Sequence, residues 1–146
     1  MMVCLASVQA EQKMIRASGT FEVKLAPVGN DSTAEGPNLA RMSMDKTFAG
    51  DFDGVGKGEM ITAAGLAVKE SAAYSAVERL TGALHGKQGS FALQHTGIMN
   101  RGKPSLTITV VPDSGTGALT GLTGKMDIII EGKAHKYVFE YSITKE

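Results

Sequence analysis

Val110-Val111-Pro112-Asp113-Ser114-Gly115-Thr116-Gly117-Ala118-Leu119-Thr120-Gly121-Leu122-Thr123-Gly124 is the stretch that decides the fold. It has the pattern of a strand end, a turn punctuated by glycines and the start of a second strand, with no helical periodicity beside it. Short alternating runs broken by Gly, Asp, Asn and Pro recur from Met14 onward. The pattern predicts antiparallel strands joined by hairpins.

Eight segments fit strands. The connection Ala26–Asn38 is rich in Pro, Gly, Asn and Asp, and we expect a surface loop there. Glu70–Arg79 fits a helix as well as a strand, so periodicity leaves it open. The eight strand candidates are Ile15–Leu25, Leu39–Ala49, Lys57–Val68, Ala73–His85, Ser90–Met99, Ser105–Val111, Leu119–Glu131 and His135–Thr144.

Three hairpin turns test whether the apolar faces of neighbouring strands agree. We place two-residue turns at Asp53-Gly54, Lys87-Gln88 and Gly132-Lys133. In each register the more apolar faces of the two strands coincide, as a sheet with one buried face requires. The cross-strand pairs implied by these turns include Lys46 with Ile61, Phe48 with Glu59, Leu80 with His95, Glu78 with Gly97, and Ile128 with Tyr137.

The apolar faces of all eight strands need a common interior, because no convincing helix is available to cover an open sheet. A closed antiparallel eight-stranded meander barrel, resembling a lipocalin, removes the sheet edges and leaves room for side chains or one small ligand. A two-sheet sandwich would bury the same faces. We therefore predict an all-β barrel, with the sandwich as the alternative.

Size and composition limit the possible functions. A chain of 146 residues fits one domain, and we expect an N-terminal extension over residues 1–13 and a single barrel domain over 14–146. Fifteen basic and fifteen acidic residues cancel and Trp is absent, which argues against nucleic-acid or membrane partners. Cys4 is the sole cysteine, so a disulfide framework is excluded and a cytoplasmic location is expected.

Four segments in order, Ala17–Val23, Met42–Phe48, Gly82–His95 and Val111–Gly117, resemble the bacterial domain-of-unknown-function 3224 family. The likeness covers nearly everything after Met14. It implies a fold similar to the allene oxide cyclase and dirigent barrels, which are closed eight-stranded meanders and often oligomeric. The resemblance therefore implies a homo-oligomer. The catalytic positions of those barrels do not match this chain residue by residue, so no catalytic role is carried over.

Polar side chains on the predicted inner face are the candidates for chemistry. Glu78 and His95 are diagonal neighbours on adjacent strands, about 7–8 Å apart, and as a base and an acid they are the candidate catalytic pair. A structural ion pair is the competing interpretation and is favoured over catalysis. Lys46 and Glu59 form a second diagonal pair in the predicted register. The candidate ligand-binding residues are Lys46, Glu59, Tyr74, Phe91, Tyr137 and Tyr141.

Other motifs do not support a cofactor or a metal. Gly54–Gly58 lacks the spacing of a phosphate-binding loop. By parity His85 points outward while His95 and His135 point inward on distant strands, so the three histidines do not converge on a metal. No cofactor and no metal site are therefore expected.

Three functions remain open. The first is a binding module that holds a small, largely apolar molecule inside the barrel. The second is a cofactor-independent cyclase or isomerase acting on an apolar substrate there. The third is a non-catalytic structural homo-oligomer with a packed interior. Small inner residues at Ala76, Gly82 and Gly97 favour some internal space, which weakens the third.

Overall fold

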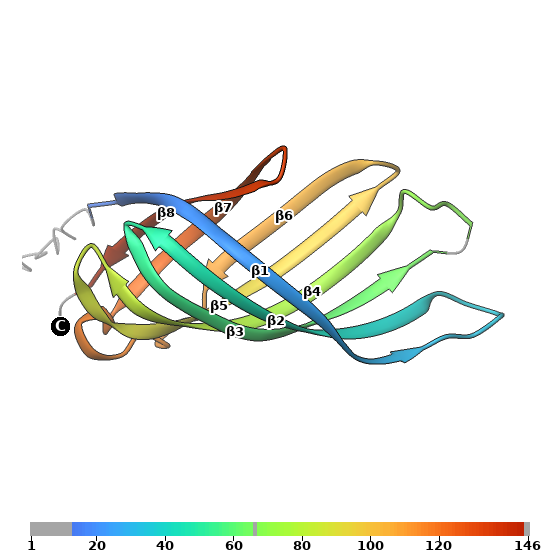
Figure 1. Ribbon diagram of the computed structural model, residues 1–146, viewed down its shortest axis with the longest axis horizontal. Coiled ribbons are helices and arrows are strands. Elements are labelled where there is room, and N and C mark those ends of the chain that lie inside the picture. The colour runs from blue at the N-terminus through green and yellow to red at the C-terminus, as the bar shows by residue number, and fades with distance from the viewer. Residues whose placement is uncertain (1–12, 66, 145–146) are drawn as a thin grey trace, which may run out of the picture.

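The computed structural model describes residues 13–65 and 67–144, which form a closed antiparallel barrel with the strands in chain order (Figure 1). This confirms the predicted eight-stranded meander. Residues 1–12 of the predicted extension, including Cys4, lie outside the described residues. The strands are β1 (Ile15–Asp31), β2 (Asn38–Gly50), β3 (Phe52–Ala64), β4 (Ala72–Leu84), β5 (Lys87–Asn100), β6 (Lys103–Val110), β7 (Leu122–Glu131) and β8 (Ala134–Ile143).

The strands β1 and β2 are longer than predicted. β1 continues to Asp31 past a register shift between Pro27 and Gly29, so most of the predicted loop Ala26–Asn38 belongs to a hairpin. This shift is a β-bulge: β1 has one more residue here than β2, and the two strands stay paired beyond the proline. The segment Glu70–Arg79, which the sequence left open, enters β4 as a strand.

Two hairpins keep their predicted faces. The β7–β8 turn lies at Gly132-Lys133 as predicted, and Ile128 pairs with Tyr137. The β4–β5 turn lies at His85-Gly86 instead of Lys87-Gln88, where both residues have positive φ (47° and 79°), as a type I′ hairpin turn requires. The displacement is even, so every side chain of β4 and β5 stays on its predicted face.

The predicted register of β2 and β3 is wrong. Lys46 pairs with Gly56 instead of Ile61, an odd displacement that turns Glu59 and Ile61 to the outside of the barrel. The cause is that the chain reverses at Gly50, whose φ is +106°, and not at Asp53-Gly54.

Asp51 fixes this turn by contacts that are remote in sequence. Its backbone N–H donates to Ser18 O (3.0 Å), its Oδ2 accepts from the Ser18 N–H (2.9 Å), and its carbonyl accepts from the His85 N–H (2.8 Å). Because these bonds tie the β2–β3 turn to β1 and to the β4–β5 turn, they outweigh the local turn preference of Asp-Gly.

One half of the barrel, the closed half, is filled solidly. Leu119 is fully buried in the one-turn helix η1 (Gly117–Leu119), so the predicted strand start at Leu119 is wrong and β7 begins at Leu122. No helix in the described part of the chain is long and apolar enough to cross a membrane. The buried side chains of the closed half include Ala17, Phe21, Phe48, Phe52, Leu80, Leu84, Phe91, Leu93, Tyr137, Phe139 and Tyr141.

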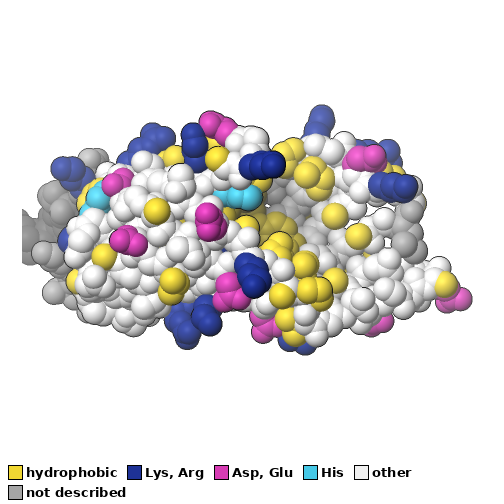
Figure 2. All heavy atoms as spheres, in the orientation of Figure 1, with side chains coloured by type: hydrophobic (Ala, Val, Ile, Leu, Met, Phe, Trp, Pro, Cys, Tyr) yellow, Lys and Arg dark blue, Asp and Glu magenta, His cyan; other side chains and the backbone are white. Residues whose placement is uncertain are grey.

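The other half, the open half, is incompletely closed because β8 covers only part of β1 and because β6 and β7 stop pairing while both strands continue. β8 pairs with β1 only as far as Phe21, and β7 pairs with β6 only at Ile108 and Thr109. Beyond these points the inner wall of the longer strands is uncovered, and Figure 2 shows a hollow there bordered by hydrophobic side chains. Exposed side chains of this wall are Leu25 (44%), Met99 (39%) and Leu106 (38%).

Candidate functional site

Three charged or titratable side chains meet inside the barrel where the open half joins the closed half. Lys46 Nζ lies 2.8 Å from Glu78 Oε2, and His95 Nε2 lies 3.0 Å from the same oxygen. The exposed fractions of Lys46, Glu78 and His95 are 7%, 2% and 2%. Tyr74 joins them, since its hydroxyl lies 3.4 Å from His95 Nδ1. We call these four residues the polar cluster.

Glu78 and His95 are neighbours, as the sequence predicted. The pairing itself differs, because His95 lies opposite Ala76 and Glu78 opposite Leu93. Both displacements are even, so the two side chains remain diagonal on the inner face and come into contact. Their predicted catalytic role stays a prediction.

Glycines of β3 make the contact between Lys46 and Glu78 possible. Lys46 on β2 and Glu78 on β4 have β3 between them, where Gly56 pairs with Lys46 and Gly58 with Glu78. A Cβ at Gly58 would lie 2.7 Å from Glu78 Cβ, and one at Gly56 would lie 3.2 Å from the Phe48 ring. Because Gly56 and Gly58 carry no side chains, the Lys46 ammonium and the Glu78 carboxylate meet across β3.

The sequence contains a signal for this arrangement that is independent of the hairpin registers. Glycines at alternate positions 54, 56 and 58 lie on the inner face of one strand, beside a lysine of the strand before and a glutamate of the strand after. Alternate glycines in a strand mark a close approach by neighbouring groups. Interpreted in that way, Gly54–Gly58 predicts that large side chains from both neighbours cross over β3.

The environment of Glu78 keeps its carboxylate charged. Burial alone raises the pKa of Glu78, but the contact with His95, followed by the charge of Lys46 and its hydrogen bond, outweighs burial and holds that pKa below its ordinary value. The Lys46 ammonium also lies 5.0 Å from the centre of the Phe21 ring, within cation–π range. Burial and the negative charge of Glu78 raise the pKa of Tyr74, so its phenol stays protonated.

One acceptor of the polar cluster lacks a donor. Glu78 Oε1 is buried and has no hydrogen-bond partner among the described residues. His95 Nε2 approaches Oε2 at ion-pair distance but without the alignment of a hydrogen bond. Oε1 lies 3.5 Å from the position that a Cβ of Gly56 would take. A buried carboxylate oxygen without a donor is costly and favours a bound donor there.

The predicted pairing of Lys46 with Glu59 is wrong. Glu59 lies on the outer face, where its Oε1 accepts from Arg41 Nη2 at 2.8 Å, and both side chains are 55% exposed. The odd displacement of β3 causes this, since it exchanges the two faces of that strand. Glu78 is the counter-ion of Lys46 instead.

Phe91, Tyr137 and Tyr141 belong to the closed half. Phe91 stacks on a neighbouring aromatic ring in the core. The Tyr137 hydroxyl accepts from the Phe52 N–H (2.9 Å) and contacts backbone carbonyls of the β2–β3 turn. The Tyr141 hydroxyl bonds His85 Nδ1 (2.5 Å), and burial followed by the charge of Asp51 raises the pKa of Tyr141. Both hydroxyls are therefore engaged away from the polar cluster.

A pocket of about 240 Å³ adjoins the polar cluster at Tyr74. The Tyr74 ring lies against β5 because Gly97 has no side chain; a Cβ there would overlap the ring. The pocket therefore meets the polar cluster through the phenol. Its walls in the open half include Met60, Thr62, Tyr74, Gly97, Met99 and Pro104.

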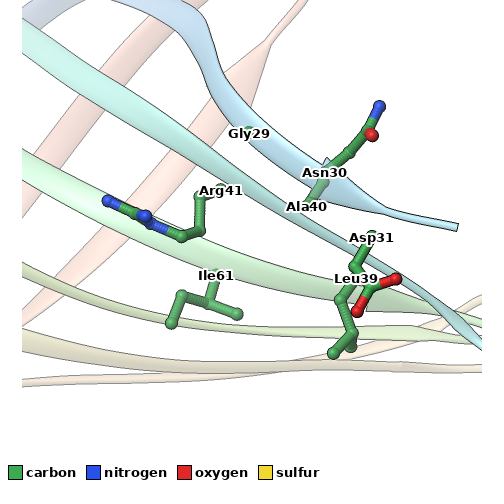
Figure 3. A pocket seen from close by; sticks show the side chains of 7 residues that line it. All are labelled: Gly29, Asn30, Asp31, Leu39, Ala40, Arg41 and Ile61. Atoms are coloured by element: carbon green, nitrogen blue, oxygen red, sulfur yellow. The ribbon is translucent and has the colours of Figure 1, made fainter.

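A second pocket, of about 320 Å³, lies at the far end of β1, β2 and β3. In Figure 3 the side chains of Leu39 and Ile61 extend on the same side, and Gly29 contributes none. Arg41, the cation at its edge, is already paired with Glu59. This pocket touches no buried polar group of the cluster, so the smaller pocket at Tyr74 is the better candidate site.

Within residues 13–65 and 67–144, no three side chains of His, Cys, Asp or Glu are grouped so that they could hold a metal ion. His85, His95 and His135 lie apart, with His85 in a turn and His135 beside the Phe21 ring. The chemistry that the polar cluster offers is hydrogen bonding and proton transfer.

Comparisons with known proteins identify relatives without an activity. A family model described as "Protein of unknown function (DUF3224)" matches residues 17–141. A crystal structure of a protein with unknown function from the DUF3224 family of Shewanella oneidensis MR-1 is 46% identical, with a TM-score of 0.85 over 91% of this chain and 100% of that one. A comparison with curated proteins finds no significant match.

Proposed function

This chain belongs to the DUF3224 family, and from that premise we propose that it binds a small, largely apolar molecule in the open half of its barrel. One observation carries the proposal: inward-facing apolar side chains are exposed beside a buried polar cluster. Leu25, Met99 and Leu106 face the interior, yet more than a third of each is exposed. Water-exposed apolar surface that lines a concavity, with a few polar groups at its end, is the usual form of a ligand site.

The energetics favour an apolar guest. Fully burying one Leu or Met side chain contributes about 1.5–3 kcal/mol, so a molecule that covers the exposed parts of several such side chains gains a favourable contribution to binding. The flexible thioethers of Met60 and Met99 at the pocket wall adapt to the shape of a guest. The pocket of about 240 Å³ suits a molecule of a single ring or a short chain.

The electrostatics favour binding over the cyclase or isomerase alternative. A general acid or base works best when its pKa lies near the working pH. His95 and Lys46 hold the pKa of Glu78 below its ordinary value, which makes the carboxylate a permanent acceptor and a weak base. The structural alternative needs a packed interior, which the exposed wall of the open half does not provide. The homo-oligomer, the cytoplasmic location and the allene oxide cyclase likeness stay predictions.

A tryptophan reporter tests the proposal, because the natural chain contains no Trp. Leu106 lies opposite Gly97 on the inner face, so Leu106→Trp places a fluorophore at the open half, while Val77→Trp places one on the outer face as a control. Each variant is titrated with three compounds of similar shape: 4-ethylphenol, 4-ethylanisole and 4-ethyltoluene.

We expect at least one compound to change the Leu106→Trp emission saturably while the Val77→Trp emission stays constant. Native mass spectrometry of the wild-type protein should show a one-to-one complex with the same compound. If none of the three saturates the inner reporter, or if both reporters respond alike, the proposed site is wrong.

A further inference from the structure

We propose that the natural occupant of the open half is a neutral molecule with a hydroxyl head, of the phenol or alcohol class, whose O–H donates to the polar cluster. This inference rests on the proposed function and adds the chemistry of the head group. Three observations carry it: the order of the polar contacts from Glu78 through His95 to Tyr74, the charge balance of Lys46 with Glu78, and the buried oxygen of Glu78 that lacks a donor.

The hydrogen-bond direction follows from the carboxylate. An ionised carboxylate only accepts, so the His95 Nε2 atom at 3.0 Å from Glu78 Oε2 must carry the ring proton. With the ring proton on Nε2, Nδ1 is the acceptor nitrogen of that tautomer, and the Tyr74 hydroxyl at 3.4 Å donates to it. The hydroxyl proton of Tyr74 is therefore engaged with His95 Nδ1. Tyr74 presents only the lone pairs of its oxygen to the pocket, and these favour a guest with a hydrogen-bond donor.

The charge balance excludes a charged guest. The Lys46 ammonium and the Glu78 carboxylate, 2.8 Å apart and almost fully buried, cancel each other. A third charge, on the guest or on His95, would stand unpaired in an interior of low dielectric constant, which is strongly unfavourable. A neutral hydroxyl avoids this cost, whereas an ammonium or a carboxylate head does not.

The unpartnered oxygen points to the same head group. Glu78 Oε1 has no donor among the described residues, although the carboxylate is nine-tenths buried or more. The interior therefore presents two acceptors, the Tyr74 oxygen and Glu78 Oε1, while the His95 Nε2 atom faces Glu78 Oε2 at 3.0 Å. A guest that brings its own O–H complements this surface, and a ketone or ether of the same shape does not.

The experiment compares compounds that share a 4-ethylphenyl group and differ in the head group. The dissociation constants of 4-ethylphenol, 4-ethylanisole and 4-ethyltoluene, and of the charged 4-ethylbenzoate and 4-ethylbenzylammonium, are measured with the Leu106→Trp reporter. We expect the phenol to bind about tenfold more tightly than the anisole, which keeps the oxygen and loses the proton. Both charged compounds should bind more weakly than the anisole.

Two variants assign the selectivity to Tyr74. In Tyr74→Phe, the preference for phenol over anisole should fall below about threefold. Thr62→Val is the matched control: it removes a hydroxyl from the same pocket, one whose proton bonds the Ala40 carbonyl, and should retain the preference. Circular dichroism checks that both variants keep the barrel.

The outcomes separate this inference from the proposed function. If the phenol and the anisole bind equally well, or the anisole binds more tightly, the donor assignment is wrong while the site stands. A preference for phenol that survives in Tyr74→Phe overturns the inference that the Tyr74 oxygen accepts from the guest. If no compound binds at all, the proposed function itself fails.

Discussion

Removing the charge of Glu78 while keeping its shape should strongly destabilise the protein. In Glu78→Gln, the Lys46 ammonium stays buried without a counter-ion. At 2.8 Å and an effective dielectric constant of about 20, Coulomb's law gives an attraction of about 6 kcal/mol, which desolvation of the two ions largely offsets. Once the carboxylate is lost, the desolvation cost of the ammonium remains, so the free energy of unfolding should fall by about 3–5 kcal/mol.

The outer face provides a matched control for this variant. Arg41 and Glu59 have the same N–O distance of 2.8 Å, but both side chains are 55% exposed. Water screens that pair, so Glu59→Gln should cost less than about 1 kcal/mol. The assay is equilibrium urea denaturation at pH 7, followed by circular dichroism, with both variants and the wild type measured together.

A double variant separates charge from packing. Lys46→Met combined with Glu78→Leu removes both charges and fills similar volume, so its stability should lie within about 1 kcal/mol of the wild type, or above it. If Glu78→Gln costs no more than Glu59→Gln, the pair is solvated and the enclosed cluster described above is wrong. If the double variant is as unstable as the single one, packing and not charge explains the loss.

Three further outcomes are expected. Gly58→Ala should cost more than about 2 kcal/mol of unfolding free energy in urea denaturation, because its Cβ would overlap the Val77 carbonyl oxygen and lie 2.7 Å from Glu78 Cβ. Gly56→Ala, with 3.2 Å to its nearest atom, should cost less, and equal costs would contradict the glycine argument. Tyr137→Phe should cost about 1–3 kcal/mol in the same assay, because the buried Phe52 N–H loses its acceptor; a neutral effect would mean that water replaces the hydroxyl. The folded-state pKa of Glu78 is lowered, so its contribution to stability is present above the ordinary pKa of 4.5 and is lost as the pH falls through the lowered pKa. The wild-type melting temperature should therefore fall more steeply below about pH 4.5 than the melting temperature of the charge-free double variant. Parallel curves for the two proteins would refute this.

The local pattern of residues was sufficient to predict the strands, the barrel and the inward direction of Glu78 and His95. Alternation with a period of two is a property of each strand alone, so it survives an error in the pairing of neighbours. The β4–β5 register differs from the prediction by an even number of residues, and for that reason the contact between Glu78 and His95 could be predicted despite the misplaced turn.

Only the tertiary structure decided which counter-ion Glu78 has and where the barrel is open. The turn at Asp51 is set by hydrogen bonds to Ser18 and His85, which are distant in sequence, and the odd displacement that follows moves Glu59 outside and brings Lys46 to Glu78. The open half exists because β8 is shorter than β1 and because β6 and β7 pair at only two positions. Periodicity shows which way a side chain points, but the contacts between strands determine what it meets.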